Sequence, residues 1–254
     1  MSLLKRLFRK SGESKPALAP FTAALAPDSS FFAIGDIHGC LAQMQALLDQ
    51  VTTLNAEAPI IFVGDYVDRG EDSAAVLFAL FALRDDPRIT CLAGNHEDMM
   101  LAFVDQPSEK GERWLRYGGM QTLASFGVGG VSMSSKGEAI AAAAEALKSA
   151  MGPDLLAWLR DLPRMTQNGN VAVVHAGADP NTPIALQGAR TLSWGHRDFD
   201  TQPRQDGIWV LHGHTIMDSP VARDGRIAID TGAYATGRLT AAYVQTGDVQ
   251  FLST

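Results

Sequence analysis

Short apolar runs alternate along the chain with longer segments whose apolar residues recur every three or four positions. The runs 31–34 and 59–63 are rich in aromatic or β-branched residues and lead into Gly-Asp, which indicates buried strands followed by loops. Residues 41–54 have helical spacing of apolar side chains, and further helices are expected over 73–83 and 97–104. This alternation predicts a mostly parallel first sheet with crossover helices.

The middle of the chain has a different pattern. Helices are expected over 112–126, 136–151 and 153–162, and these segments contain no cluster of Asp and His residues. We therefore expect a helical insert at about 107–165, which either lines a substrate groove or serves as plain scaffold. Strands return at residue 171, and the chain is expected to close with a hairpin.

The first 29 residues differ from the rest. Residues 2–10 form a short basic amphipathic segment, and residues 11–27 are rich in Ser, Ala, Gly and Pro. We expect residues 1–29 to be a flexible tail and linker, and residues 30–254 to be the folded domain. Docking of the basic segment on a membrane surface or on a partner protein is the alternative interpretation.

Composition narrows the class of protein. The 254 residues are enough for one large domain or two small ones, and a hydrophobic content of 46% can fill a sizeable core. The formal net charge of −7 argues against broad nucleic-acid binding. The two cysteines, Cys40 and Cys91, suggest no disulfide framework, so we expect a reducing, cytoplasmic location. No apolar run is long enough for a transmembrane segment, and no signal peptide is expected.

Candidate chemistry lies at the ends of the predicted strands. Five strand-like runs end in Asp, Asn or His beside a glycine, and in open sheets ligands gather at the carboxyl ends of strands. Such a density of polar groups beside buried strands is costly unless something binds there. The five motifs are Gly35-Asp36-Ile37-His38-Gly39, Gly64-Asp65-Tyr66-Val67-Asp68-Arg69-Gly70, Gly94-Asn95-His96-Glu97, His175-Ala176-Gly177 and His212-Gly213-His214-Thr215.

These residue types suit divalent metal ions and phosphate. Mixed oxygen and nitrogen ligands favour Mn, Fe, Zn or Mg, and a carboxylate such as Asp65 can bridge two ions that act together on phosphorus. His96 follows Asn95 and is a candidate acid for the leaving group, with Asp68 as the residue that orients it. Arg69 offers a planar fork for phosphate oxygens. The candidate metal ligands are Asp36, His38, Asp65, Asn95, His175 and His214.

The combined motifs, in this order, resemble the phosphoprotein phosphatase family of calcineurin-like metallophosphoesterases, and most closely its bacterial and phage serine/threonine phosphatases. The resemblance covers about residues 31–245. It implies an α/β fold in which a two-sheet β-sandwich is flanked by helices, with a dinuclear metal site at the strand ends. The implied ions are two divalent metals, typically manganese, with iron or zinc as alternatives. The implied ligands are Asp36, His38 and Asp65 for the first ion, and Asp65, Asn95, His175 and His214 for the second.

Two positions need separate interpretation. The family pattern Gly-His-Thr selects His214 as the ligand, so His212 is expected to be an accessory or plain strand residue. Bacterial relatives tend to carry a second phosphate-binding arginine in a Trp-x-Arg motif, whereas this chain has Trp194-Gly195-His196-Arg197. We expect Arg197 to replace that arginine by a shift of one residue.

The resemblance implies a serine/threonine protein phosphatase, which hydrolyses phosphoserine or phosphothreonine by direct attack of a metal-bound hydroxide. The alternative is an enzyme of the same fold that cleaves dinucleoside polyphosphates such as diadenosine tetraphosphate. The form Tyr66-Val67-Asp68-Arg69-Gly70 favours the phosphatase slightly. The expected partner is accordingly a phosphorylated protein, or a phosphorylated small molecule or nucleotide. A third hypothesis, an inactive fold used for binding, predicts a lost ligand or a lost acid, and every expected one is present.

Overall fold

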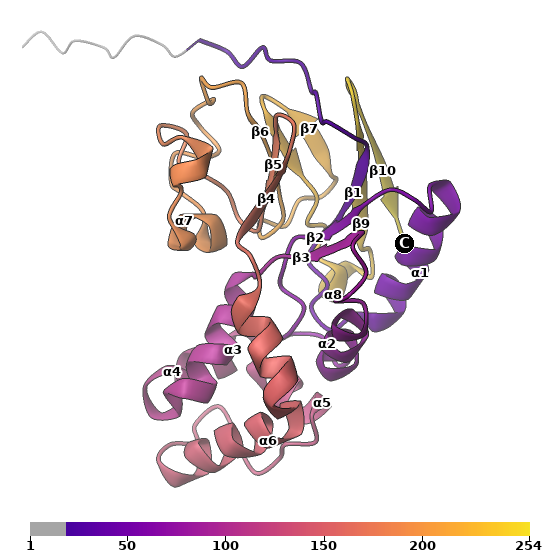
Figure 1. Cartoon of the computed structure of the whole chain (residues 1–254). Coiled ribbons are helices and arrows are strands. Elements are labelled where there is room, and N and C mark those ends of the chain that lie inside the picture. Colours follow the sequence, from indigo (N-terminus) through magenta and orange to yellow (C-terminus); the bar gives the residue numbers. More distant parts are fainter. Residues whose placement is uncertain (1–18) are drawn as a thin grey trace, which may run out of the picture.

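Two five-stranded sheets pack face to face in the computed structural model, which describes residues 19–254, and helices cover the outer faces (Figure 1). Each sheet combines parallel with antiparallel strands. This arrangement confirms the predicted two-sheet sandwich flanked by helices. Within the described residues, no helix is both long enough and apolar enough to cross a bilayer.

The first sheet is built from both ends of the chain. Its three parallel strands come from the predicted strand–helix alternation. One strand of the closing hairpin pairs antiparallel with the first strand of the chain, and the other pairs antiparallel with its hairpin partner. In their order across the sheet, the strands are β10 (Asp248–Ser253), β9 (Thr240–Gln245), β1 (Phe31–Ile34), β2 (Ile60–Phe62) and β3 (Ile89–Cys91).

The second sheet is formed by the later part of the chain. Three of its strands are parallel, and two short strands pair antiparallel at the edges. Both edge strands are polar or short, so the sequence pattern did not indicate them. In their order across the sheet, the strands are β4 (Met165–Asn168), β5 (Val171–Val174), β6 (Trp209–His212), β8 (Arg226–Ala228) and β7 (Val221–Arg223).

The space between the sheets is filled by one face of each central strand. Phe31 and Ala33 of β1 point into this core, whereas their neighbours Phe32 and Ile34 face the helices. This alternation follows from the two-residue period of side chains along a strand. Because both faces of β1 are buried, its sequence is apolar throughout rather than alternating.

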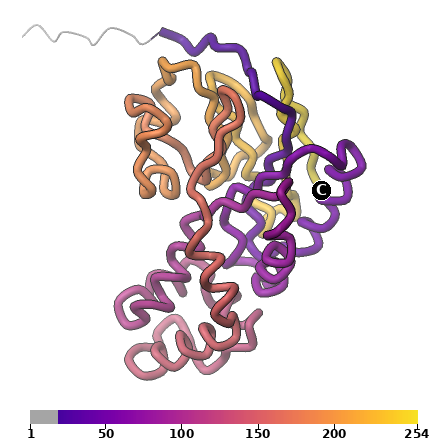
Figure 2. Tube along the Cα trace, viewed as in Figure 1, coloured from indigo at the N-terminus to yellow at the C-terminus, as the bar shows by residue number. Residues whose placement is uncertain are grey.

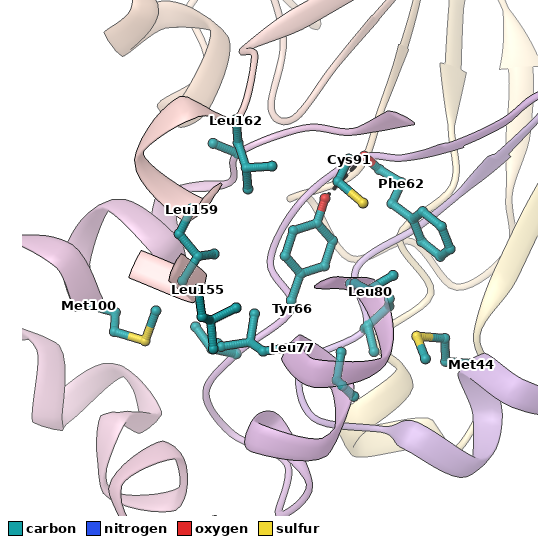
Figure 3. Close-up of a cluster of buried hydrophobic side chains, with 14 of the residues drawn as sticks. Met44, Phe62, Tyr66, Leu77, Leu80, Cys91, Met100, Leu155, Leu159 and Leu162 are labelled. Carbon is teal, nitrogen blue, oxygen red and sulfur yellow. Dashed lines mark hydrogen bonds between the residues drawn. The ribbon is translucent and has the colours of Figure 1, made fainter. Parts of the chain in front are cut away.

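Helices bury the outer face of the first sheet. Figure 3 shows Tyr66 surrounded by leucines of α2 and α6. The Tyr66 hydroxyl donates to the Leu92 carbonyl at 2.6 Å. The helices that contribute to this layer are α1 (Leu41–Leu54), α2 (Ser73–Ala82), α3 (Asn95–Asp105) and α6 (Glu138–Asp161). On the other side of the molecule, the short helix α7 (Ala189–Trp194) packs Leu192 against the outer face of the second sheet.

The helices that follow β3 and precede β4 in the sequence form a lobe beside the sandwich (Figure 2). The helix expected over 112–126 is divided into three pieces, because Gly118 has a φ of 109° inside a π-helical turn. The break expected near residue 152 is present as a kink at Gly152, which has a φ of 73°. The pieces of the divided helix are α4 (Pro107–Trp114), the π-turn (Leu115–Gly119) and α5 (Met120–Ser125).

The described part of the N-terminal segment lies against the second sheet before the chain enters β1 (Figure 1). The indole nitrogen of Trp209 donates to the Ala23 carbonyl at 3.0 Å, and the Asn170 side chain accepts from the Ala26 N–H at 2.8 Å. The basic segment at residues 2–10 lies outside the described residues. The division of the chain at residue 30 stays a prediction, as does the assignment of about 107–165 as an insert.

Candidate active site

The predicted metal ligands meet where strands of both sheets end. The first sheet delivers four of them after β1, β2 and β3, and the second sheet delivers His175 after β5 and His214 after β6. Five of the six are buried, and His214 is partly exposed. The parallel strands point their carboxyl ends to one edge, so residues far apart in sequence share one site.

Asp65 occupies the centre of this site. Its Oδ2 lies 3.6 Å from Nε2 of His38 and 3.4 Å from Nε2 of His175. Two groups of side chains have the spacing to hold a metal ion, namely Asp65 with His38 and His96, and Asp65 with His175 and His214. Because Asp65 belongs to both groups, the geometry suits a carboxylate that bridges two ions.

Backbone carbonyls fix the orientation of two of these histidines. Nδ1 of His38 lies 2.7 Å from the Val67 carbonyl oxygen, and Nδ1 of His175 lies 3.0 Å from the Val63 carbonyl oxygen. A carbonyl only accepts, so each Nδ1 carries the hydrogen and each Nε2 faces Asp65. Carbonyl partners of this kind are typical of metal-binding histidines.

The acceptor oxygens at the centre of the site favour a positive charge between them. Nε2 of His175 lies 2.9 Å from Oδ1 of Asn95, an oxygen that only accepts, as does the carboxylate of Asp65. Burial lowers the pKa of His175, but the adjacent Asp65 more than offsets this and raises it to about 10. Burial lowers the pKa of His38 to about 3. A proton on His175 thus supplies the charge that a metal ion would supply, and the residues fit divalent ions.

Asp36 is held by the backbone of the opposite sheet. Its carboxylate accepts the His214 N–H at 3.0 and 3.1 Å, and a Cβ on Gly213 would overlap Oδ1 of Asp36. Burial raises the pKa of Asp36, and the neighbouring carboxylate of Asp230 adds to the shift. Asp230 is buried and was not among the predicted site residues, although it belongs to the Ile229-Asp230-Thr231 run after β8.

The loops that carry these residues have unusual backbone conformations. Among the described residues, six non-glycine residues have positive φ, and five of them belong to the predicted site. Such conformations cost on the order of 1 kcal/mol or more each and need support from their surroundings. The five residues are His38 at 46°, Asp65 at 55°, Asp68 at 72°, Arg69 at 70° and His214 at 63°.

Glu97 supplies part of that support. Its carboxylate is fully buried and accepts the N–H groups of Asp65 and Tyr66 at 2.8 Å and that of Gly94 at 2.9 Å. One side chain therefore fixes the loop after β2 to the start of α3. The sequence places an acidic residue three positions after Gly94, which is a usual helix-start signal, but it gives no sign of the contact with Asp65.

His96 and Asp68 form a close pair beside Asp65. Nδ1 of His96 lies 2.6 Å from Oδ2 of Asp68, as the sequence led us to expect of an acid and its orienting residue. Asp68 also accepts the Trp114 indole N–H and the Thr122 hydroxyl, at 3.0 and 2.7 Å. Burial lowers the pKa of His96, but Asp65 and Asp68 more than offset this, so its net pKa is raised.

Arg69 lies at the mouth of the site. Its Nη2 lies 3.2 Å from Nε2 of His96, and its guanidinium carbon lies 4.8 Å from the centre of the Tyr234 ring. Its backbone N–H donates to the Gly118 carbonyl at 3.3 Å. The guanidinium is thus close to the proposed acid and held by residues that the sequence did not indicate.

Two other predicted residues lie apart from these ligand groups. The Arg197 side chain is 89% exposed and its charged neighbour is Asp198, at 3.7 Å, so the structure does not bring it to the cluster. Nδ1 of buried His212 donates to the Gly213 carbonyl at 3.0 Å, and its ring packs on Phe199. Burial lowers the pKa of His212 to about 4, which leaves it a neutral strand residue.

Known proteins are similar to this chain in sequence or in fold. Residues 29–218 match the family model described as calcineurin-like phosphoesterase. A symmetrical bis(5'-nucleosyl)-tetraphosphatase of Ralstonia nicotianae is 29% identical, and the alignment covers 83% of this chain and 87% of the relative. A symmetrical bis(5'-nucleosyl)-tetraphosphatase of Pseudomonas fluorescens is 31% identical over 59% of this chain, and the match spans only 43% of that relative's length.

Two solved structures share the fold. One, provisionally described as a diadenosine tetraphosphatase, has a TM-score of 0.62 at 22% identity and covers 91% of this chain and 98% of its own. The other, a cold-active protein-tyrosine phosphatase of a psychrophilic Shewanella, has a TM-score of 0.60 at 15% identity and covers 90% of this chain and 83% of its own. At these identities the two structures show the fold alone, and the family match over most of the sequence shows the family. This protein belongs to the calcineurin-like phosphoesterase family.

Proposed function

We propose that this protein hydrolyses dinucleoside tetraphosphates, such as diadenosine tetraphosphate, into two nucleoside diphosphates. The observation that carries the proposal is the similarity to the Ralstonia tetraphosphatase, which extends over 83% of this chain and 87% of the relative. The relatives thus favour the alternative substrate of the sequence analysis over phosphoserine or phosphothreonine. The cold-active tyrosine phosphatase is similar in fold alone.

The form of the 66–70 loop favoured a protein phosphatase, but the position of Tyr66 in the structure weakens that preference. That preference rested on the form of the 66–70 loop, which begins with Tyr66. The Tyr66 side chain is fully buried and its hydroxyl donates to the Leu92 carbonyl, so it is a core residue that no substrate can contact (Figure 3). Tyr66 therefore gives no reason to prefer a peptide over a nucleotide.

The ligand assignment is also part of the proposal. Asp36, His38 and Asp65 would hold one divalent ion, and Asp65, Asn95, His175 and His214 the second; manganese is the expected metal. When bound, the two ions would neutralise phosphate oxygens and activate a water molecule. Asp65 would be common to both ions, in agreement with its place in both groups of side chains.

The bond changes follow from symmetrical cleavage. A water oxygen forms a bond to one of the two central phosphorus atoms, and the bond from that phosphorus to the central bridging oxygen breaks. The bridging oxygen leaves with the other nucleoside diphosphate. His96 would donate a proton from Nε2 toward this oxygen, since its Nδ1 is occupied by Asp68 at 2.6 Å.

Arg69 has two roles in this proposal. In the structure its Nη2 lies 3.2 Å from Nε2 of His96, an arrangement that requires a lone pair on Nε2. A phosphate group at the mouth of the site would compete for the guanidinium and leave Nε2 free to carry a proton. Arg69 would then bind phosphate oxygens through its planar fork. Arg197, whose side chain is exposed and lies beside Asp198, receives no role.

The test compares two substrates on the same preparation. Protein loaded with manganese is assayed for kcat/KM on diadenosine tetraphosphate and on a phosphothreonine peptide, with a chelator-treated sample as control. We expect preference for the tetraphosphate, with ADP as the only nucleotide product. A preference for the peptide would overturn the proposed substrate. Activity that survives complete metal removal would overturn the proposed ligand assignment.

A further inference from the structure

A cluster of one cation and two aromatic rings lies beside the His96 site. The guanidinium carbon of Arg113 is 4.7 Å from the Trp194 ring centre and 5.9 Å from that of Tyr117. The Tyr117 ring is in turn 6.4 Å from the imidazole of His96. Arg113 lies in α4, Tyr117 in the π-turn and Trp194 in α7. We call these three residues the Arg113 cluster.

Arg113 is available to bind an anion. In the part of the chain that the structure describes, it forms no ion pair, whereas Arg116 on the same surface pairs with Glu112. A guanidinium that lies over an aromatic ring keeps its N–H groups at the edge, where they can bind phosphate oxygens. Arg113 therefore carries a positive charge whose hydrogen-bond donors are not used within the described residues.

The backbone fixes the cluster relative to the active site. The π-turn that carries Tyr117 also contains Gly118, whose carbonyl accepts the N–H of Arg69 at 3.3 Å. A Cβ on Gly118 would meet the Arg69 backbone, so the close approach depends on this glycine. Turns of this kind often occur at functional sites. The α4 surface is thus tied to the loop that carries the proposed phosphate-binding arginine.

The space beside Arg113 suits an extended substrate. Arg113, Arg116 and Tyr117 line an open cavity of about 450 Å³ together with Glu109 and Glu112. A tetraphosphate has charged phosphate groups beyond the scissile bond, and these need partners outside the catalytic centre. A phosphomonoester has no such groups. Arg197 cannot serve here, because its side chain points into solvent.

We propose that Arg113 is a specificity-determining residue that binds a non-scissile phosphate of a polyphosphate substrate. The inference rests on the proposed function for the identity of the natural substrate. It predicts that polyphosphates, whether free or attached to a nucleoside, are recognised at the Arg113 cluster. A substrate with a single phosphate gains nothing from it.

The first experiment compares Arg113→Ala with wild type and with the control Lys110→Ala, which removes an exposed positive charge of α4 that does not line the cavity. We expect Arg113→Ala to lower kcat/KM for diadenosine tetraphosphate by about tenfold to a hundredfold, the usual effect of losing a charged hydrogen bond, mainly through KM. Hydrolysis of p-nitrophenyl phosphate should be unchanged. Arg113→Lys should recover part of the loss, and Lys110→Ala should change the hydrolysis of neither substrate. Equal loss on both substrates, or no loss on either, would overturn the role of Arg113.

A second experiment does not depend on tetraphosphate cleavage. Inorganic tripolyphosphate is used to inhibit p-nitrophenyl phosphate hydrolysis, and its inhibition constant should rise about tenfold or more in Arg113→Ala. An unchanged inhibition constant in Arg113→Ala would overturn the proposed role of Arg113 even if the tetraphosphate is the substrate. A wild-type enzyme that fails to cleave the tetraphosphate refutes the proposed function instead. Thermal unfolding of each variant shows whether the loss of packing on Trp194 alters the fold.

Discussion

The indole N–H of Trp114 donates to both carboxylate oxygens of Asp68, at 3.0 Å each. Trp114 is fully buried in α4, and its ring packs against Phe103 of α3 at 4.6 Å. Thr122 of α5 donates to the same carboxylate. The helical segment therefore reaches the residue that orients His96, and it does more than cover one side of the site.

Replacing Trp114 with Phe should weaken that orientation. The variant keeps an aromatic ring but loses the N–H that fixes Asp68, so we expect kcat to fall by about 10- to 100-fold with unchanged metal content. Steady-state kinetics and metal analysis measure both quantities. The control is Trp158→Phe, because the Trp158 indole N–H has no hydrogen-bond partner within residues 19–254. An equal loss in both variants would show a general packing defect.

Replacing His96 with Asn should separate proton donation from metal binding. A general acid contributes about 10²- to 10⁴-fold, and it matters most when the leaving oxygen is strongly basic. We therefore expect a larger loss of kcat on an alkyl phosphate than on p-nitrophenyl phosphate. Metal content, measured by elemental analysis, should stay near the wild-type value. A substantial loss of metal in this variant would instead assign His96 to the ligands.

Replacing Glu97 with Gln should destabilise the loops that carry the site. The amide nitrogen would face backbone N–H groups that now donate to a carboxylate oxygen, which leaves buried donors without acceptors. We expect the free energy of unfolding to fall by about 2–4 kcal/mol. Denaturant unfolding of the metal-free protein measures this change. The exposed control Glu57→Gln should stay within about 0.5 kcal/mol of wild type, and an equally small effect at Glu97 would contradict its supporting role.

Cys91 should be unreactive in the folded protein. Burial raises the pKa of its thiol to about 12, so almost no thiolate is present at pH 8. Because the folded pKa exceeds that of the unfolded chain, near 8.5, its contribution to stability is complete below that pH and is lost as pH rises toward 12. A disulfide reagent at pH 8 should label only the half-buried Cys40 before unfolding and both thiols afterwards. The Cys40→Ser variant should then show no labelling while folded, and rapid labelling of that variant would refute the burial argument.

The grouping of the six predicted ligands could be anticipated from the sequence because each of them follows a strand within a few residues. A buried strand that is followed by a glycine and a polar side chain can be recognised locally in the sequence. The parallel arrangement of the strands then brings these polar side chains to the same edge of the sheet. The partners of Asp68 could not be predicted in this way, since Trp114 and Thr122 lie 46 and 54 residues away in sequence and reach it only through packing. Their ranges look like ordinary helix.

The position of Arg197 shows a second limit of sequence reasoning. The residue follows Gly195, whose φ of 79° turns the chain sharply after α7, so the direction of the next side chains depends on a backbone angle that the sequence does not specify. In the structure the Arg197 side chain is exposed to solvent. The arginine that packs on Trp194 near the site is Arg113 of α4, which no motif indicated.

The assembly of the site from two sheets has a consequence during protein synthesis. A ribosome that has reached residue 150 has produced Asp36, His38, Asp65 and Asn95 but neither His175 nor His214. In the proposed assignment the second ion needs both of the missing histidines, whose strands β5 and β6 belong to a sheet that has not yet been made. A nascent chain can therefore gather the ligands of one ion early, whereas capture of the pair must wait until the later sheet emerges and docks. Complete metal loading would then mark the end of folding on this chain.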